Sequence, residues 1–245
     1  MYTNTVGPEA IAVSVPCPRI SVILPVRNEE TVLASCLRSV RASPSPCPVE
    51  IIVVDGQSSD RSLDVAARFG ARSLSAPTAG RSRQMHWGAL HAAGEILVFL
   101  HADTVLPPHW VTRVHRTFLQ SPAPPAAASF SLAFDSRRLD YRALSALANI
   151  RSRMTGLPHG DQALIVSRKM YFEAGGFPDV PLMEEYLFIP KLKRLGPIAQ
   201  FPERVVTSSR RYDRGGAIRT TLKKVALIVL FYVGVPPARL ARWYW

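Results

Sequence analysis

One stretch of the chain, residues 94–104, limits the fold more than any other. It reads G-E-I-L-V-F-L-H-A-D-T, an unbroken apolar run over residues 96–100 followed at once by His101 and Asp103. A run this short and this rich in Val, Ile and Phe is typical of a strand buried on both faces, which usually lies in a parallel sheet. Such sheets bind ligands at the carboxyl ends of their strands. The sequence therefore places an imidazole and a carboxylate where a ligand would bind.

Two similar apolar runs and one shorter, more polar segment precede this stretch, and segments with helical spacing separate them. We predict strands over residues 19–25, 49–54, 71–75 and 96–100, with Pro25 ending the first. Cys36 falls in the first helical pattern, so we expect it in the core. The alternation of strand and helix predicts an α/β fold, a Rossmann-like and mostly parallel central sheet with helices on both faces.

The pattern changes after Asp103. It predicts helices over residues 107–119 and 141–154, strands over residues 127–134 and 163–167, and a short segment from Glu184 to Leu195. Proline in a helix interior costs about 3 kcal/mol. We therefore expect a helix to break or to start at Pro190.

Composition and charge indicate one globular domain with a basic end. No linker is long enough to divide the chain, so we expect a flexible tail over residues 1–18, a domain over residues 19–216 and a basic amphipathic helical extension over residues 217–245. The net charge is +12, and residues 191–245 hold 12 Lys and Arg against 2 acids. This end suits an anionic membrane or a phosphorylated substrate. It lacks a recognisable nucleic-acid-binding module, so nucleic acid is not an expected partner.

The extension allows two interpretations. Ile218, Leu222, Val225 and Val229 share one helical face, which would lie on a membrane or pack across the domain as core. No apolar run reaches about 18 residues, so we expect no spanning helix. Three cysteines without a C-x-x-C pair are typical of a reducing cytoplasm.

Polar side chains follow three of the predicted strands: Asn28 and Glu29 after the first, Asp55 after the second and Asp103 after the fourth. Acids that converge at one sheet edge bind a nucleotide's base and ribose, or hold Mg²⁺ or Mn²⁺ with substrate phosphates. Each also has a simpler explanation, because Asp55 would suit a turn and Asp103 an ordinary loop. No G-x-G-x-x-G follows the first strand and no G-x-x-x-x-G-K-[ST] occurs, which disfavours dinucleotide and P-loop sites.

Several motifs together resemble family 2 glycosyltransferases of the GT-A fold, and in particular a small bacterial branch with H-A-D-T in place of the usual D-x-D. The matching segments are I-S-V-I-L-P-V-R-N-E-E (20–30), I-I-V-V-D-G-Q-S-S-D (51–60), G-R-S-R-Q-M (80–85), G-E-I-L-V-F-L-H-A-D-T (94–104), G-D-Q-A (160–163), G-G-F-P-D-V-P-L-M-E-E (175–185) and S-S-R-R-Y (208–212). The resemblance covers about residues 19–245. It is specific for the superfamily and says little about the sugar.

The resemblance implies a donor site. The donor-binding residues that it implies are Pro25, Asn28, Glu29, Asp55, Arg81 and Arg83. Asp55 matches the acid that binds the base or ribose of the donor, and Arg81 matches a basic residue near the donor. Surface charge is the alternative for both arginines.

The resemblance also implies a metal site and a catalytic base. Asp103 matches the acid that binds Mn²⁺ or Mg²⁺, with His101 in the first position of that motif, although His101 would also suit a structural hydrogen bond. Glu184 and Glu185 match the family's E-D pair, whose second acid is the usual base. The simpler explanation is that acids are favoured at helix N-termini.

The polar island of residues 159–162 is expected on the acceptor side of the site. Its members are His159, Asp161 and Gln162. A plain loop is the alternative interpretation for the same residues.

The resemblance implies a metal-dependent, inverting glycosyltransferase that moves a sugar from a nucleotide-sugar donor to an acceptor hydroxyl. UDP-hexose is the expected donor by family frequency, and a lipid-linked acceptor is expected at the inner face of the cell membrane, with the protein in the cytoplasm. One alternative is a degenerate relative that binds without catalysis, since Glu185 replaces an Asp. A nucleotidyltransferase would need a Gly-rich N-terminal loop, which residues 26–30 lack.

Overall fold

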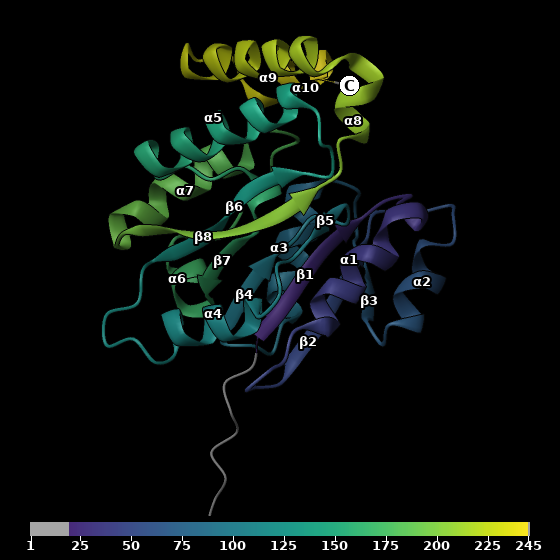
Figure 1. The fold of residues 1–245 in the computed structure, drawn as a ribbon, viewed down its shortest axis with the longest axis vertical. Helices are drawn as coiled ribbons and strands as arrows, with labels where there is room; N and C mark the ends of the chain where they lie inside the picture. Colours follow the sequence, from purple (N-terminus) through teal and green to yellow (C-terminus); the bar gives the residue numbers. More distant parts are fainter. Residues whose placement is uncertain (1–19, 245) are drawn as a thin grey trace, which may run out of the picture.

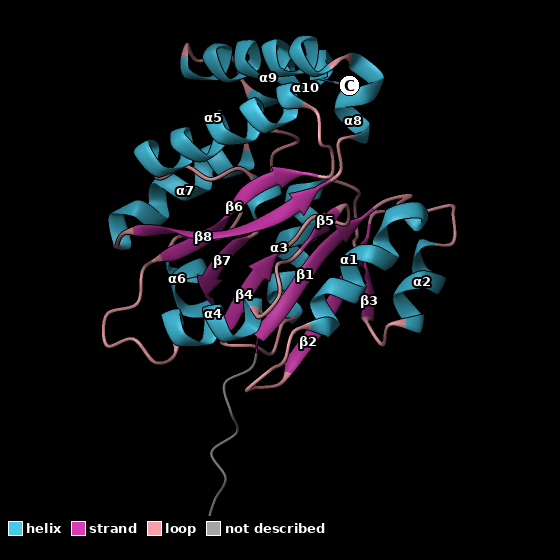
Figure 2. Cartoon of the chain, in the orientation of Figure 1, coloured by secondary structure: helices cyan, strands magenta, loops and turns pink. Residues whose placement is uncertain are grey.

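The computed structural model describes residues 20–244, which form a curled sheet between helices (Figures 1 and 2). The eight strands that this part contains lie in the order β3-β2-β1-β4-β7-β6-β8-β5. Their bounds are β1 (Ile20–Val26), β2 (Val49–Asp55), β3 (Arg72–Ser75), β4 (Ile96–Phe99), β5 (Thr104–Val105), β6 (Ala127–Phe134), β7 (Leu164–Ser167) and β8 (Ile198–Thr207). The helices are α1 (Glu30–Ala42), α2 (Ser62–Arg68), α3 (Arg81–His91), α4 (Trp110–Phe118), α5 (Leu139–Thr155), α6 (Arg168–Glu173), α7 (Glu184–Leu195), α8 (Arg210–Gly215), α9 (Ala217–Tyr232) and α10 (Pro237–Tyr244).

The N-terminal half is the predicted parallel sheet. β1 pairs in parallel with β2 and β4, and β2 pairs in parallel with β3. Alternate side chains of these strands belong to different cores: Val22 packs in the cluster that includes α1 and α4, and Ile23 in the cluster that includes α3 and α7. Helices on both faces bury the sheet, as the apolar runs predict. Cys36 is buried in the first cluster, as expected.

The prediction that Pro25 ends the first strand is wrong. β1 continues through Pro25 to Val26, and these two residues pair with Val54 and Asp55 of β2. On its other side, β1 pairs with β4 only as far as Ile23. Proline is tolerated in a strand where no ladder donor is needed, and at Pro25 one side of β1 has no neighbouring strand.

The C-terminal half of the sheet is mixed. β7 is antiparallel to both β4 and β6, whereas β6 and β8 are parallel. The sequence predicts β6, β7 and α5 to within a few residues. It does not predict β5, β8 or α6. The long strand β8 interrupts its apolar residues with Pro202, Glu203 and Arg204, which hides its period of two.

The prediction of a helix break at Pro190 is also wrong. α7 runs from Glu184 to Leu195 with Pro190 inside it. Phe188, Ile189 and Leu192 on this helix are at most 1% exposed. Burying side chains of this size stabilises by about 1.5–3 kcal/mol each, which outweighs the cost of about 3 kcal/mol for one interior proline.

The C-terminal helices pack on the domain through a small separate cluster. Leu227 of α9 and Leu240 of α10 meet Leu182 and Met183, which immediately precede α7. Figure 1 shows α9 and α10 together at one end of the molecule. The expected tail over residues 1–18 lies outside the described residues, as does Trp245. None of the described helices is long and apolar enough to cross a bilayer.

Candidate active site

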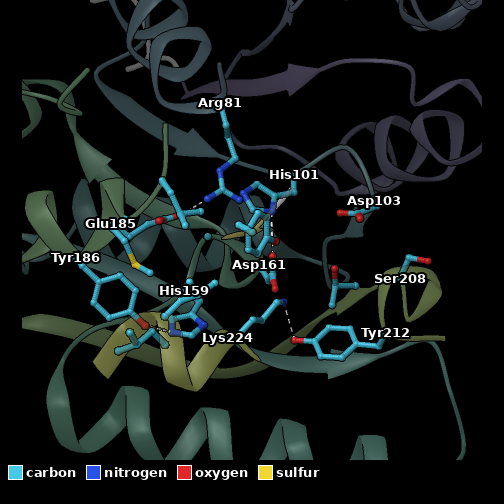
Figure 3. A pocket seen from close by; sticks show the side chains of 17 residues that line it. Arg81, His101, Asp103, His159, Asp161, Glu185, Tyr186, Ser208, Tyr212 and Lys224 are labelled. Carbon is cyan, nitrogen blue, oxygen red and sulfur yellow. Dashed lines mark hydrogen bonds and ion pairs between the residues drawn. The ribbon is translucent and has the colours of Figure 1, made fainter. Parts of the chain in front are cut away.

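A pocket of about 100 Å³ lies beyond the carboxyl end of β4, between the sheet and the C-terminal helices (Figure 3). Side chains from β8, α7, α8 and α9 meet there with the residues that follow β4. The residues that line it are Arg81, His101, Asp103, His159, Gly160, Asp161, Leu182, Met183, Glu185, Tyr186, Thr207, Ser208, Tyr212, Lys224, Leu227, Ile228 and Tyr244. Five of the residues named from the sequence as metal, catalytic or acceptor residues are among them.

Asp103 lines this pocket and lies close to a cation. Nη2 of Arg210 is 3.7 Å from Oδ2 of Asp103, and the same guanidinium forms an ion pair with Glu29 after β1. The backbone N–H of Ser208 also donates to the carbonyl of Asp103 at 3.1 Å. The N-terminal end of α8 is therefore attached to two strand ends of the parallel sheet.

His101 and Asp161 form a partly buried pair. Nδ1 of His101 is 3.0 Å from Oδ1 of Asp161. Burial would raise the pKa of Asp161, but the His101 hydrogen bond and the charge of Lys224 outweigh it and lower that pKa well below its usual range. Among the described residues, Nε2 of His101 finds no hydrogen-bond partner. It lies beside Gly160, where an added Cβ would come within 2.7 Å of it.

The two acids at the start of α7 have different surroundings. Glu184 is 1% exposed, and its Oε1 accepts from Nε of Arg81 at 2.5 Å. Glu185 lines the pocket, with Oε1 3.7 Å from Nη2 of Arg81. Burial first, and then the charge of Glu184, raise the pKa of Glu185, and Arg81 opposes them in part. Glu185 is thus a carboxyl group with increased proton affinity that faces the pocket.

Of the three residues predicted on the acceptor side, two face the pocket and one is buried outside it. His159 lines the pocket, and its Nε2 is 2.5 Å from the hydroxyl of Tyr186. Burial, with the nearby charge of Arg151, lowers the pKa of His159 to about 3, so the ring is neutral near pH 7. Gln162 lies behind the pocket, fully buried, where its Oε1 accepts from Ser152 at 2.7 Å. Gln162 therefore holds the turn, and His159 and Asp161 face the cavity.

A second pocket of about 530 Å³ adjoins the first and shares Arg81, Leu182 and Tyr244 with it. The predicted donor residues that line it are Pro25, Glu29, Arg81 and Arg83. Gly80 at its edge has φ 146°, a backbone conformation that favours glycine at the start of α3.

The remaining two predicted donor residues, Asn28 in the loop after β1 and Asp55 at the end of β2, do not line this pocket. Oδ1 of Asn28 accepts from the N–H of Ser59 at 2.8 Å, and Oδ2 of Asp55 accepts from the N–H of Gln57 at 3.1 Å. In this structure both side chains bond to backbone that follows β2. The simpler interpretation, a turn residue, describes the present contacts of Asp55.

Sequence reasoning missed four residues that shape the site: Arg210, Tyr212, Lys224 and Tyr244. Nζ of Lys224 donates to the hydroxyl of Tyr212 at 2.8 Å. Burial lowers the pKa of Lys224, but the charge of Asp161 and the contact with Tyr212 together outweigh burial and raise that pKa, so the side chain is a cation in the pocket. Arg210 and Tyr212 belong to the S-S-R-R-Y segment, which matches the family motif but was assigned no function from the sequence. No signal marked Lys224 beyond its charge.

The side chains near Asp103 suit a metal ion that is bound partly by the protein and partly by the substrate. No group of three or more His, Cys, Asp or Glu side chains within residues 20–244 is arranged to hold an ion. Mg²⁺ and its analogues are usually bound through one or two carboxylates plus substrate phosphates. Asp103 fits such a site. The ring nitrogens of His101 lie instead beside Asp161 and Gly160.

Comparison with curated proteins finds glycosyltransferases. The chain is 36% identical over 94 residues to the 4,4'-diaponeurosporenoate glycosyltransferase of Staphylococcus haemolyticus, a match that covers 36% of this chain and 24% of that protein. It is 34% identical over 84 residues to an uncharacterized glycosyltransferase of Mycobacterium tuberculosis, covering 34% of this chain and 36% of the relative. These matches thus span about a quarter to a third of the relatives' length.

Solved structures share the fold at low identity. Glucosyl-3-phosphoglycerate synthase from Mycobacterium tuberculosis, in complex with phosphoglyceric acid, aligns with a TM-score of 0.63 at 24% identity, over 89% of this chain and 81% of that one. A mannosyltransferase from Pyrobaculum calidifontis, in complex with GDP-Man and Mn²⁺, aligns with a TM-score of 0.63 at 23% identity, over 85% and 61%. The fold is therefore GT-A. The family model for glycosyl transferase family 2 matches residues 21–177, well over half of the chain, and the protein belongs to that family.

Proposed function

We propose that this protein is a metal-dependent, inverting glycosyltransferase that moves a sugar from a nucleotide-sugar donor to an acceptor hydroxyl. One observation carries the proposal: Glu185, a carboxyl group of raised pKa, lines the same pocket as Asp103. A general base works best when its pKa lies near the working pH. The donor pocket meets this one at Arg81, so the two substrates would meet beside Glu185.

The donor would occupy the larger pocket. Its walls hold Arg81 and Arg83 at the N-terminus of α3, where backbone N–H groups and guanidinium groups suit phosphate oxygens. Solved structures of similar fold include complexes with UDP, UDP-GlcNAc and GDP-Man. A UDP-hexose is the donor that we propose, from its frequency in the family.

Asp103, together with the donor's diphosphate oxygens, would hold Mn²⁺ or Mg²⁺. When bound, the ion would neutralise the negative charge that develops on the departing nucleoside diphosphate. Two solved structures of similar fold contain Mn²⁺, which supports this part of the proposal. Arg210 lies close enough to Asp103 to add a second positive charge at the same place.

Glu185 would remove the proton from the acceptor hydroxyl as that oxygen attacks the anomeric carbon. The C–O bond to the acceptor forms while the bond to the diphosphate oxygen breaks, so one displacement inverts the configuration. Arg81 donates to the buried carboxylate of Glu184, and the charge of Glu184 in turn raises the pKa of Glu185. Asp161 stays paired with His101, which leaves Glu185 as the base.

The acceptor would be a hydroxyl compound with an apolar body. Leu182, Met183, Leu227 and Ile228 form an apolar part of the pocket lining. Such a wall suits a lipid or lipid-linked acceptor, and one relative is named for a carotenoid acid. We place the protein in the cytoplasm, at the inner face of the cell membrane, on this ground.

Release of nucleoside diphosphate from a panel of UDP-, GDP- and dTDP-sugars tests the proposal. It is measured with Mn²⁺, with Mg²⁺ and with chelator, and with a lipid extract as acceptor. We expect release from one donor that chelator abolishes, and that Glu185→Gln and Asp103→Asn each lower by about 10²–10⁴-fold. Glu173→Gln, an exposed acid on α6, is the matched control and should keep full activity.

Two results would contradict the proposal. Release that survives Glu185→Gln would assign the base to another residue. Donor binding by calorimetry without turnover on any acceptor would favour the degenerate relative, in which the longer Glu side chain at this position has ended catalysis.

A further inference from the structure

Helix α9 has two apolar sides, and only one of them is buried. Leu227 is 3% exposed and, with Ile228 and Lys224, lines the pocket below the helix. The opposite side holds four residues at helical spacing that stay in solvent: Ile218 (70% exposed), Leu222 (64%), Val225 (50%) and Val229 (54%). An ordinary surface helix buries one apolar side and exposes a polar side to solvent.

The exposed side is not part of the core of this domain. Of the two interpretations that the sequence allows for these four residues, packing across the domain is wrong, since each is at least half exposed. Three more apolar side chains of this helix pair are 50–76% exposed: Tyr232 and Val233 at the end of α9, and Trp243 near the end of α10. Exposed apolar side chains gathered on one pair of helices mark an interaction site in a soluble protein. We call the row on α9, together with these three residues, the α9 face.

The charge around the α9 face selects one kind of partner. Residues 214–245 contain six Lys and Arg and no Asp or Glu. Arg219 is exposed beside the apolar row on α9, and Arg239 and Arg242 lie exposed on α10. Lys223 is directed toward α10 instead, where its Nζ donates to the carbonyl of Tyr244 at 3.0 Å. A second copy of the face would bring like charges together. An anionic lipid surface supplies both an apolar layer and opposite charge.

The length of α9 indicates how the helix would lie relative to a bilayer. α9 has 16 residues, about 24 Å at 1.5 Å per residue. A hydrocarbon layer is about 30 Å thick, so the helix suits the plane of the interface rather than a crossing. Figure 1 shows α9 along the outer edge of one end of the molecule, where a flat surface can reach it.

We propose that the α9 face binds an anionic lipid bilayer, with α9 lying in the plane of the interface. The apolar row enters the boundary between headgroups and acyl chains, and Arg219, Arg239 and Arg242 contact anionic headgroups. The pocket lies on the other side of the same helix, so binding would hold the pocket about one helix diameter from the lipid. This inference does not depend on the transfer reaction, because it concerns binding alone.

Cosedimentation with vesicles tests the proposal. One set of vesicles contains equal parts of phosphatidylcholine and phosphatidylglycerol, and the other contains phosphatidylcholine only. We expect binding to the anionic set that weakens in high salt, and weaker binding to the neutral set. The double variant Leu222→Glu with Val225→Glu should lower the affinity at least tenfold, and Arg219→Gln about fivefold.

Controls separate this result from damage to the fold. Leu63→Glu changes a leucine of similar character, 37% exposed on α2, which Figure 1 shows far from α9. It should bind vesicles as the unchanged protein does. The double variant should keep its circular dichroism spectrum and its affinity for nucleoside diphosphate, because neither substituted residue lines a pocket.

Three outcomes would overturn the inference. The first is no binding to anionic vesicles at low salt. The second is equal binding by the double variant. The third is a dimer in light scattering that the double variant dissociates, without vesicle binding by either protein, which would assign the face to a second copy of the chain.

Discussion

The guanidinium group of Arg81 lies 2.5 Å from Oε1 of Glu184 and 3.7 Å from Oε1 of Glu185, so one cation serves two adjacent acids unequally. The nearer acid is buried and bonded, and the farther one faces the pocket. Two side chains that are neighbours in sequence therefore have separate roles. Glu184 fixes the cation, and Glu185 is placed to exchange a proton with a ligand.

Substitutions of the two acids should have different effects. Glu185→Gln should lower turnover by about 10²–10⁴-fold and leave stability nearly unchanged, because it removes a base. Glu184→Gln should destabilise the fold by about 2 kcal/mol, since it weakens a charged hydrogen bond at a buried site, and should retain most activity. Urea unfolding and donor turnover measure the two quantities. Equal loss of turnover in both variants would contradict separate roles.

The dependence of turnover on pH should move with Glu184. Burial and the Glu184 charge raise the pKa of Glu185, and a base must be deprotonated to act. Turnover should therefore rise with pH through this raised pKa. Removing the neighbouring charge in Glu184→Gln lowers the pKa of Glu185, so the acidic limb should shift to lower pH. Profiles of kcat against pH for both proteins test this, and a shift to higher pH would refute it.

Arg210→Ala should weaken donor binding. Arg210 brings a positive charge to Asp103 and Glu29, at the edge where the diphosphate would lie. Loss of a charged contact to phosphate should raise the KM for the donor about tenfold, with a smaller change in kcat. Arg116→Ala, which removes an exposed arginine on α4, is the matched control. An unchanged KM in the first variant would place the diphosphate elsewhere.

Gly160→Ala should disable the site without unfolding the protein. A Cβ at this position would overlap Oε1 of Glu185 and lie 2.7 Å from Nε2 of His101, so both side chains would have to move. Displacement of about 1 Å costs roughly 10²-fold in rate. At Gly196 the nearest atom to an added Cβ is 3.3 Å away, so Gly196→Ala is the control. Full activity of Gly160→Ala would show that the pocket tolerates movement of Glu185.

The first half of the fold follows from its sequence because β1, β2 and β4 are short apolar runs between clear helical patterns. β8 escaped the prediction, since Pro202, Glu203 and Arg204 interrupt its alternation. The prediction at Pro190 failed because local propensity and tertiary packing disagree there. Local propensity argues for a break there, and the packing of Phe188 and Leu192 decides for a continuous helix.

The candidate site was predictable at residues that belong to a recognisable sequence motif. Asp103 and Glu185 could be proposed from their motifs, and the structure places both on one pocket. Contacts between distant residues could not be foreseen in the same way. Arg210 meets Glu29 across 181 positions, and Lys224 enters the pocket from a helix whose spacing predicted only an apolar face. The roles of all these residues await the measurements above.

The small cluster that attaches α9 and α10 has a consequence for engineering. These helices line part of the proposed acceptor pocket. They contact the body of the protein at Leu182, Met183 and Tyr186, outside the two cores that stabilise the sheet, and through the hydrogen bond of Lys224 to Tyr212. Residues 217–244 thus form a cap that is separate from those cores. A library confined to that cap, with Tyr244 kept because it also lines the larger pocket, would sample new acceptors while Asp103 and the proposed donor site stay constant.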